Sequence, residues 1–436
     1  MHSRTVKFIT LGCKVNQYDT QDIRERFIRA GFKEITNGKK ADAYVINTCT
    51  VTAVADRKSR SFIHYAYRSN PKAKILVTGC YAELDSRKIA EIPGVTHIIK
   101  NKDKNRIVEL LNPVRDTAHL GNNAMVSNGV NANNATGITG FSGHTRAFLK
   151  IQDGCNNFCS YCKVPLVRGA CRSKALDEIV QEANRLVKNG FKELVLCGIC
   201  LGSYGRDLKA KVHLVDVIEA LENTEGLLRI RLSSLEAGDV SDRLIEKMVH
   251  SKKLCRHLHI PIQSGDDEIL KKMNRGYKAS GYLNLIERIK KCVPDAAITT
   301  DVLVGFPGEK DENFQNTVRL IKEVLPLRTH IFPYSKREGT QAAKNFNEKL
   351  DYKVIKERID CLKKIAQDCA FNFKKQFLSQ SMDALMEDKI GGYWKGHTDN
   401  YIKVWVKSHR NLRNQFISVK LNKIIKDYVL ADLKKG

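Results

Sequence analysis

Short apolar runs that alternate with helical segments are the feature that most constrains the fold of this chain. Within residues 5–111 the strand-like runs are 6–10, 43–47, 74–78 and 95–99, and the helical patterns lie near 19–30, 53–69, 84–91 and 103–111. Strands that alternate with helices are typical of βαβ units. The pattern predicts an open parallel α/β sheet as an N-terminal domain over residues 1–116.

The alternation restarts after Thr145 and continues through six further strand-like segments. They are 146–152, 193–198, 227–234, 257–263, 297–306 and 328–335. One helical segment between them, 174–189, carries a single apolar face and ends before Gly190. Six β/α units predict a partial (β/α)6 barrel over residues 144–370, with its functional site at the carboxyl ends of the strands.

Two segments differ from the rest of the chain in composition and residue pattern. Residues 117–143 are rich in Asn and Gly and have little to pack, which predicts a flexible linker. Residues 371–436 carry both tryptophans, short alternating runs, and 13 Lys and Arg against 6 Asp and Glu. This composition predicts a small, basic, antiparallel β barrel.

Charge and hydropathy limit the partners and the location of the protein. The chain has 74 Lys and Arg against 48 Asp and Glu, a net charge of +26, which attracts polyanions, although a solvated basic surface gives the same number. Its apolar stretches are far shorter than the ~18–20 residues that span a bilayer, and MHSRTVKFIT has no apolar signal core. We therefore expect a cytoplasmic protein without a membrane partner.

Thirteen cysteines in such a protein are not a disulfide framework, because the cytosol keeps thiols reduced. Cys13, Cys49 and Cys80 each follow the end of one of the first three predicted strands. Ligands of open α/β sheets gather beyond the carboxyl ends of the strands. Three thiols delivered to that edge are therefore able to meet.

A second triplet, Cys155, Cys159 and Cys162, follows the first strand of the predicted barrel in a C-x3-C-x2-C loop. Thiolates are the preferred ligands of iron–sulfur cubanes, and three ligands leave one iron open to a substrate or cofactor. The alternatives at this point are a cysteine-rich turn, or a zinc site completed by a distant histidine.

With these motifs the chain resembles the radical S-adenosylmethionine methylthiotransferase family. The resembling segments are LGCKVNQYDT (11–20), NTCTVT (47–52), TGCYAE (78–83), IQDGCNNFCSYCKVPLVRG (151–169), RLSSLE (231–236), HIPIQSGDDEILKKMNR (259–275) and TDVLVGFPGE (300–309). FPYSKREGTQA (332–342) and GHTDNYIKVWV (396–406) resemble the subgroup that acts on N6-threonylcarbamoyladenosine in tRNA. The basic C-terminal segment resembles the RNA-binding barrel called TRAM.

The resemblance implies an enzyme with two [4Fe–4S] clusters that uses S-adenosylmethionine. The triplet Cys155, Cys159 and Cys162 would hold the cluster whose open iron binds S-adenosylmethionine, and one-electron cleavage would yield a 5′-deoxyadenosyl radical that activates C2 of the adenine. The triplet Cys13, Cys49 and Cys80 would hold the cluster that presents the sulfur, which a second S-adenosylmethionine methylates. The cofactors carry this chemistry, so no side chain is expected to be catalytic in itself.

The resemblance also implies partners and further site residues. The partners are tRNA, an external electron donor and a sulfur source, and the base is the adenosine at position 37, next to the anticodon. Contacts with S-adenosylmethionine are expected from residues at the ends of the barrel strands, for which loop capping is the alternative. These residues are Ser233, Ser234, Glu236, Gln263 and Gly198.

The chain departs from the family pattern at two places. Cys197-Gly-Ile-Cys200 stands where the family usually has Thr-Gly-Ile-His, and Cys171 stands where it usually has a charged residue. We expect that neither Cys197 nor Cys200 is a cluster ligand, and that Cys171 has no role in the chemistry.

Arg168, which follows the cysteine loop, would either grip an RNA phosphate or form a structural ion pair.

Two other functions remain open at this stage. One is methylthiolation of isopentenyladenosine in tRNA or of a ribosomal protein by the same chemistry. The other is a non-catalytic iron–sulfur electron carrier, which would not consume S-adenosylmethionine. A carrier leaves unexplained both the open iron in each cluster and the basic β domain.

Overall fold

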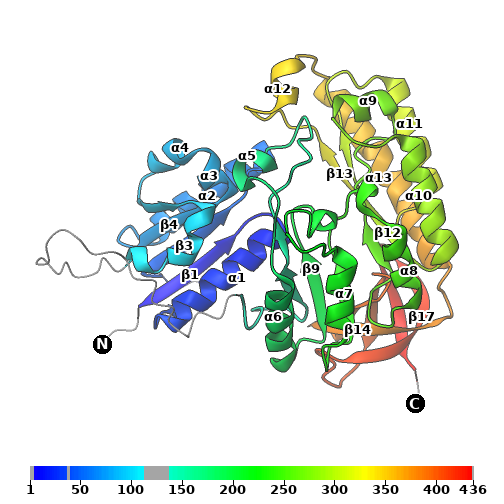
Figure 1. The fold of residues 1–436 in the computed structure, drawn as a ribbon, viewed down its shortest axis with the longest axis horizontal. Coiled ribbons are helices and arrows are strands. Elements are labelled where there is room, and N and C mark those ends of the chain that lie inside the picture. Colours follow the sequence, from blue (N-terminus) through cyan, green and yellow to red (C-terminus); the bar gives the residue numbers. More distant parts are fainter. Residues whose placement is uncertain (1–3, 37–39, 112–136, 435–436) are drawn as a thin grey trace, which may run out of the picture. The chain divides into compact units, whose positions relative to one another are not determined.

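The computed structural model describes residues 4–36, 40–111 and 137–434, which form two compact units. The N-terminal unit comprises Met1–Gly140 and Leu166–Arg168, and the C-terminal unit comprises Phe141–Pro165 and Gly169–Gly436. The predicted barrel and the predicted β domain thus share one unit (Figure 1). Most of the predicted linker 117–143 lies outside the described residues. Across the described ranges, no helix combines the length and the apolar character needed to cross a bilayer.

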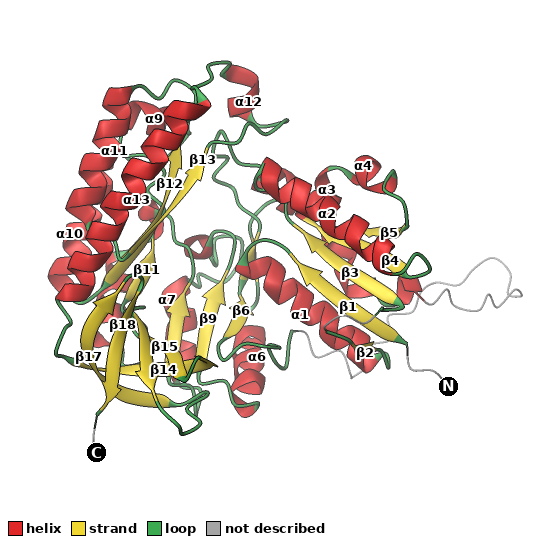
Figure 2. Cartoon of the chain, turned by 180° about the vertical axis from the view of Figure 1, so that it is seen from behind, coloured by secondary structure: helices red, strands yellow, loops and turns green. Residues whose placement is uncertain are grey.

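A five-stranded parallel sheet forms the N-terminal unit and confirms the predicted α/β fold (Figure 2). The strand order is β2-β1-β3-β4-β5. The strands are β1 (Thr5–Thr10), β2 (Lys33–Glu34), β3 (Ala43–Thr48), β4 (Lys74–Gly79) and β5 (Val95–Ile99). The central strand β3 is buried along its whole length, as expected for a sheet covered on both faces.

The helices predicted near 19–30, 53–69 and 84–91 are present with different ends, but the helix predicted near 103–111 is replaced by two short 3₁₀ helices. They are α1 (Lys14–Arg29), α2 (Ala53–Ser69), α3 (Cys80–Leu84) and α4 (Ser86–Ala90), followed by the 3₁₀ helices η1 (Asn101–Arg106) and η2 (Glu109–Leu111). The α1 helix begins before residue 19 because its first turn is held by polar contacts rather than by apolar periodicity. There the buried Asn16 side chain donates hydrogen bonds to the carbonyls of Leu11 at 2.7 Å and Thr48 at 3.0 Å.

Six parallel strands in the C-terminal unit confirm the predicted partial barrel. They are β6 (Ala147–Lys150), β9 (Glu193–Cys197), β10 (Arg229–Leu232), β11 (His257–His259), β12 (Ala297–Val304) and β13 (Arg328–Pro333). They pair as β10-β9-β6 and β11-β12-β13, and a bridge between Ser234 and His259 links the two sheets. The short strands β7 (Gln152–Asp153) and β8 (Arg172–Ser173) pair antiparallel and close the loop that carries the second cysteine triplet.

The helices of the C-terminal unit flank these strands (Figure 1). They are α6 (Leu176–Lys188), α7 (Leu214–Glu222), α8 (Asp242–His250), α9 (Asp267–Lys272), α10 (Ala279–Cys292), α11 (Asp311–Val324), α12 (Gln341–Asn345) and α13 (Tyr352–Lys375), with the 3₁₀ helices η3 (Leu201–Ser203) and η4 (Ala237–Asp239). The short helix α5 (Val164–Arg168) is divided, since its residues Leu166–Arg168 belong to the N-terminal unit. The predicted helix 174–189 corresponds to α6. That helix buries Ile179, Ala183 and Leu186, and it has acidic residues in its first turn and basic ones in its last, which matches the helix dipole.

A closed five-stranded barrel ends the chain, as the sequence predicts. Its strands are β14 (Ser381–Ile390), β15 (Tyr393–Thr398), β16 (Lys403–Lys407), β17 (Phe416–Ile425) and β18 (Tyr428–Leu433), in the order β14-β15-β16-β18-β17. One pair, β16 with β18, is parallel, so the barrel is not wholly antiparallel. Alternating side chains such as Val404, Val406, Val419 and Val429 fill its interior.

A buried charge cluster joins this five-stranded barrel to strands β9 and β10 of the partial barrel. Glu193 on β9 is fully buried, with Arg231 at 2.7 Å and with Arg146 and Arg229 each at 3.8 Å. Arg229 and Arg231 also donate hydrogen bonds to backbone carbonyls of the β barrel. Burial opposes the ionisation of Glu193, but the three guanidinium groups outweigh it and lower its pKa from 4.5 to about 2. One carboxylate therefore holds in place the arginines that contact the barrel.

Replacing Glu193 by Gln should lower the free energy of unfolding by about 3–5 kcal/mol, because it leaves buried guanidinium groups without their counterion. Because the folded pKa lies below the unfolded one, the stabilisation by Glu193 is complete above pH 4.5 and is lost as the pH falls toward 2. Urea unfolding at pH 7 measures the effect. Glu219→Gln, which removes an exposed partner of Arg243, is the control and should cost no more than ~1 kcal/mol. Equal losses in the two variants would contradict the role given to Glu193.

Candidate metal and cofactor centres

The first cysteine triplet lies at one edge of the N-terminal sheet. Cys13 follows β1, Cys49 follows β3, and Cys80 begins α3 directly after β4. Burial, with smaller contributions from the neighbouring thiols Cys80 and Cys13, raises the pKa of Cys49 to about 11. The three thiols are therefore close enough to interact, as their positions after parallel strands led us to expect.

Two glycines allow this approach. Gly12 has a φ of +101°, and a Cβ there would lie 3.0 Å from the Cβ of Cys49. Gly79 has a φ of +95°, and a Cβ there would lie 2.4 Å from the carbonyl oxygen of Thr48. Each glycine directly precedes a cysteine of the triplet, so an L-residue with a side chain at either position would push the thiols apart.

Arg168 belongs to the same unit and lies beside the triplet. Its side chain is 1% exposed, donates to Asp19 at 3.2 Å and is also hydrogen bonded to the side chain of Asn16. Burial raises the pKa of Cys80, and the charge of Arg168 and a hydrogen bond from it act in the opposite direction. Arg168 thus forms a buried ion pair. Of the two roles expected from the sequence, an ion pair or a grip on an RNA phosphate, the ion pair is correct.

The second triplet occupies the loop between β7 and α5. Gly154 permits the loop to close, because a Cβ at its φ of +75° would lie 1.9 Å from the carbonyl oxygen of Ala170. Within the loop, Phe158 has a left-handed backbone with a φ of 46° and is 58% exposed. Asn274 fixes this turn by donating to the carbonyl of Phe158 at 3.0 Å.

Each sulfur of the second triplet accepts a hydrogen bond from a different donor. The backbone N–H of Asn157 lies 3.5 Å from Sγ of Cys155, and that of Val164 lies 3.4 Å from Sγ of Cys162. Nη1 of Arg275 lies 3.3 Å from Sγ of Cys159. Donors directed at a sulfur favour its thiolate form, which is the form that binds metals.

A cavity of about 330 Å³ opens beside this triplet. Its lining includes Asn157, Cys159, Glu236, Asp239, Arg275 and Tyr277. Glu236 and Arg275 form an ion pair, and burial raises the pKa of Glu236. The predicted cofactor residue Glu236 and the thiol of Cys159 thus face the same space. Arg275 is the last residue of the segment HIPIQSGDDEILKKMNR, and no residue pattern in the sequence marked it as a site residue.

The other predicted cofactor residues lie at the carboxyl ends of β10 and β11. The hydroxyl of Ser233 is buried and has no hydrogen-bond partner among the described residues. Ser234 is half-buried, and Gln263 has a left-handed backbone with a φ of 60°. An orphaned buried hydroxyl and a strained polar residue are typical of ligand sites. Together with the cavity they fit a cofactor that carries amino, carboxylate and hydroxyl groups.

Close packing against a neighbouring side chain explains why position 198 is a glycine, which the sequence alone did not show. A Cβ at Gly198 would lie 2.7 Å from Oε1 of Gln152. Gln152 in turn accepts a hydrogen bond from the backbone N–H of Cys200 at 2.9 Å and donates to Sγ of Cys171 at 3.1 Å. A contact of Gly198 with the cofactor stays a prediction.

Within the described part of the chain, no three His, Cys, Asp or Glu side chains are arranged to surround a single metal ion. A mononuclear zinc site therefore has no support from the geometry. A cubane cluster needs a different geometry, because each thiolate binds a different iron atom and the thiolates do not surround one ion.

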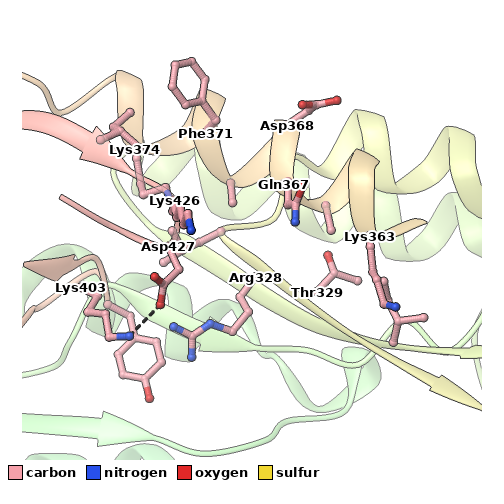
Figure 3. A pocket seen from close by; sticks show the side chains of 16 residues that line it. Arg328, Thr329, Lys363, Gln367, Asp368, Phe371, Lys374, Lys403, Lys426 and Asp427 are labelled. Atoms are coloured by element: carbon pink, nitrogen blue, oxygen red, sulfur yellow. Dashed lines mark hydrogen bonds and ion pairs between the residues drawn. The ribbon is translucent and has the colours of Figure 1, made fainter. Parts of the chain in front are cut away.

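A larger cavity, of about 890 Å³, lies between α13, β13 and the β barrel (Figure 3). It contains no cysteine, and five of its lining residues are basic against two acidic ones. The basic residues are Arg328, Lys363, Lys374, Lys403 and Lys426, and the acidic ones are Asp368 and Asp427. Lys403 is paired with Asp427 at 2.7 Å. This cavity suits an anion rather than redox chemistry.

Two family models and several known proteins match this chain. The Radical SAM superfamily model matches residues 149–321, and the model described as Uncharacterized protein family UPF0004 matches residues 5–100. A threonylcarbamoyladenosine tRNA methylthiotransferase of Bacillus subtilis is 40% identical over 96% of this chain and 94% of its own length. Its counterpart in Thermotoga maritima is 34% identical over 99% of this chain and 98% of its own length.

Two further similarities complete the comparison. A tRNA-2-methylthio-N(6)-dimethylallyladenosine synthase of Pelotomaculum thermopropionicum is 35% identical over 89% of both chains. The solved structure of a radical S-adenosylmethionine methyltransferase, TsrM of Kitasatospora setae, shares the fold, with a TM-score of 0.54, 14% identity, and coverage of 78% of this chain and 77% of that one. The chain belongs to the radical S-adenosylmethionine methylthiotransferase family.

Replacing Gly79 by Ala should destabilise the N-terminal unit more than replacing Gly31 by Ala. Both glycines have positive φ, but a Cβ at Gly31 meets open space, whereas one at Gly79 overlaps the backbone of Thr48. The overlap should add about 1–3 kcal/mol to the loss of unfolding free energy, measured by urea denaturation. Equal losses in the two variants would contradict the tight approach at the first triplet.

Proposed function

We propose that the protein is a tRNA methylthiotransferase that adds a methylthio group to C2 of N6-threonylcarbamoyladenosine at position 37, next to the anticodon. The observation that carries this proposal is the 40% identity to the Bacillus subtilis threonylcarbamoyladenosine tRNA methylthiotransferase over nearly the full length of both chains. The two cysteine triplets, each with a buried arginine beside it, give that similarity a chemical basis.

Each triplet is proposed to hold one [4Fe–4S] cluster, with Cys155, Cys159 and Cys162 at the site that takes S-adenosylmethionine. Cys13, Cys49 and Cys80 are proposed to hold the cluster that presents the sulfur. When bound, these groups supply one-electron cleavage of the sulfonium and transfer of sulfur and methyl. The chain supplies the thiolates, excludes water from the buried ones, and places a positive charge beside each triplet.

The residues around the 330 Å³ cavity are proposed to orient S-adenosylmethionine. The Glu236 carboxylate is suited to its amino group, and the Arg275 guanidinium, which is paired with Glu236, is suited to its carboxylate. The unpartnered hydroxyl of Ser233 is suited to a ribose hydroxyl. Ser234 and Gln263 are proposed to complete the contacts at the strand ends, with Gly198 close to the cofactor.

Binding of tRNA is proposed to involve residues 371–436, the domain that follows the radical core of residues 144–370. The rings of Trp405 and Tyr428 stack on each other, with their centres 4.1 Å apart. The ammonium nitrogen of Lys395 lies 5.4 Å from the centre of the Trp405 ring. Both rings are half-buried, and aromatic rings on a surface beside lysines suit base stacking and phosphate contact. The basic cavity that Lys426 and Arg328 help to line is proposed to offer further phosphate contacts (Figure 3).

The remaining partners follow from the reaction. The electron donor and the sulfur source are proposed to be external, and the cytoplasm, where tRNA resides, is the proposed location. A second candidate function is methylthiolation of dimethylallyladenosine, that is isopentenyladenosine, in tRNA. The Pelotomaculum relative, at 35% identity over 89% of both chains, is the observation that favours it.

Reconstituted protein should contain about eight irons per chain, by the count of four per cubane. Changing Cys155, Cys159 and Cys162 to Ala should halve the iron and abolish reductive cleavage of S-adenosylmethionine. Changing Cys13, Cys49 and Cys80 to Ala should halve the iron and spare cleavage. Iron analysis and quantification of 5′-deoxyadenosine measure both effects.

A control variant with Cys292 and Cys361, two exposed cysteines outside the triplets, changed to Ala should keep all the iron and all the cleavage. Cleavage that survives loss of the second triplet would overturn the assignment of the clusters.

Incubating the reduced, reconstituted enzyme with tRNA bearing N6-threonylcarbamoyladenosine should yield its 2-methylthio derivative, seen by mass spectrometry of digested nucleosides. The same enzyme with Cys155 changed to Ala should yield none. Activity on isopentenyladenosine tRNA alone, or on a ribosomal protein alone, would refute the proposed substrate and leave the radical chemistry intact.

A further inference from the structure

Three polar side chains, His259, Asp301 and His330, form a row across neighbouring strands of the partial barrel. Their strands β11, β12 and β13 are parallel and lie side by side, and the backbone register sets Asp301 opposite His330 (Figure 2). Nε2 of His259 lies 3.4 Å from Oδ2 of Asp301, and Nδ1 of His330 lies 3.8 Å from Oδ1. The centres of the two imidazole rings are 5.9 Å apart. One carboxylate thus stands between two imidazoles, and we call these three residues the polar row.

The polar row lies on the inner face of the partial barrel. On β13, Thr329 and Ile331 line the cavity beside α13, so His330 between them faces the other way, because successive side chains of a strand alternate. On β12, the residues on either side of Asp301 are at most 1% exposed, whereas the Asp301 side chain is 25% exposed. The His330 side chain is 45% exposed, and Phe332 on the same face is also exposed. The polar row is therefore accessible to a ligand.

The polar row begins beside a strand end that is proposed to hold S-adenosylmethionine. His259 pairs with Ser234 through a parallel backbone bridge, so the two residues are neighbours on adjacent strands. Ser234 is one of the residues proposed to contact the cofactor. A base that reacts with a radical from that cofactor must be held within reach of it. A substituent on the base is then well placed to meet the polar row.

We propose that the polar row recognises the N6 substituent of the target adenosine and selects a polar group that bears a carboxylate over an apolar one. The inference rests on the proposed function and deepens it, because it names the residues that choose between the two candidate substrates.

The chemistry of the two substituents gives the reason for this choice. A threonylcarbamoyl group carries a carboxylate, a hydroxyl, N–H groups and a carbonyl, for which two imidazoles and a carboxylate supply both donors and acceptors. A dimethylallyl group has no polar atom. It would displace water from the polar row without replacing the hydrogen bonds of that water, which costs binding free energy.

Binding of three anticodon stem-loop RNAs tests the proposal without requiring turnover. The RNAs are identical except at adenosine 37, whose N6 carries threonylcarbamoyl, dimethylallyl or no substituent. The full-length, reconstituted protein should bind the threonylcarbamoyl RNA most tightly. His330→Phe replaces a polar ring by an apolar one and should lower this preference about tenfold, because it removes a hydrogen-bonding group. The ratio of dissociation constants, measured by fluorescence anisotropy, gives the preference.

Two matched variants control for the size of the side chain and for the substitution itself. His330→Asn keeps a side chain that donates and accepts hydrogen bonds, so it should retain most of the preference. His250 is exposed at the end of α8, and His250→Phe should leave the preference unaltered. An unchanged preference in His330→Phe, or a loss of equal size in either control, would overturn the proposal.

Further measurements separate this inference from the proposed function. His330→Phe should keep the full iron content and the cleavage of S-adenosylmethionine without RNA, and loss of either would overturn a role confined to recognition. If the unmodified protein methylthiolates threonylcarbamoyladenosine tRNA but binds the three RNAs equally, the polar row is not a recognition site and the proposed function stands. If the unmodified protein does not modify that tRNA, the proposed function fails and this inference fails with it.

Discussion

The carboxyl edge of a parallel sheet is the constraint on which the rest of the structure depends. Every βα unit delivers the residues that follow its strand to that edge, wherever they stand in the sequence. In the N-terminal unit this brings Cys13, Cys49 and Cys80 together from three separate strands. In the C-terminal unit it brings Ser233 and the cysteine loop to strand ends of one partial barrel. Glycines with positive φ then let the chain turn sharply enough for the thiols to approach.

Burial of the thiols creates an electrostatic problem that both units solve in the same way. A buried thiol resists ionisation, yet only the thiolate binds iron. Beside Cys80 lies Arg168, paired with Asp19, and beside Cys159 lies Arg275, paired with Glu236. Each arginine is almost wholly buried and is held by one carboxylate. The repeated arrangement places fixed positive charge beside each triplet without leaving an unpaired buried ion.

The sequence predicted the sheet, the partial barrel and the terminal β barrel, because strand and helix periodicity is local and repeated. It also predicted which cysteines gather, since position after a strand is enough. It missed contacts made over long sequence separations. Arg168 lies in the cysteine segment but packs into the N-terminal unit, and nothing in its neighbours indicates this. The backbone hydrogen bond that ties Cys200 to the side chain of Gln152 joins two different strands' ends, and periodicity does not encode it.

The central claim is that two three-thiolate centres differ in what their open iron binds. Electron paramagnetic resonance of the reduced, reconstituted protein tests this most directly, with and without a non-reactive analogue of S-adenosylmethionine. Two reduced-cluster signals are expected, and the analogue should change only the one that is lost when Cys155, Cys159 and Cys162 are replaced. If the analogue changes neither signal, or changes the one that depends on Cys13, Cys49 and Cys80, the assignment of the two centres is wrong.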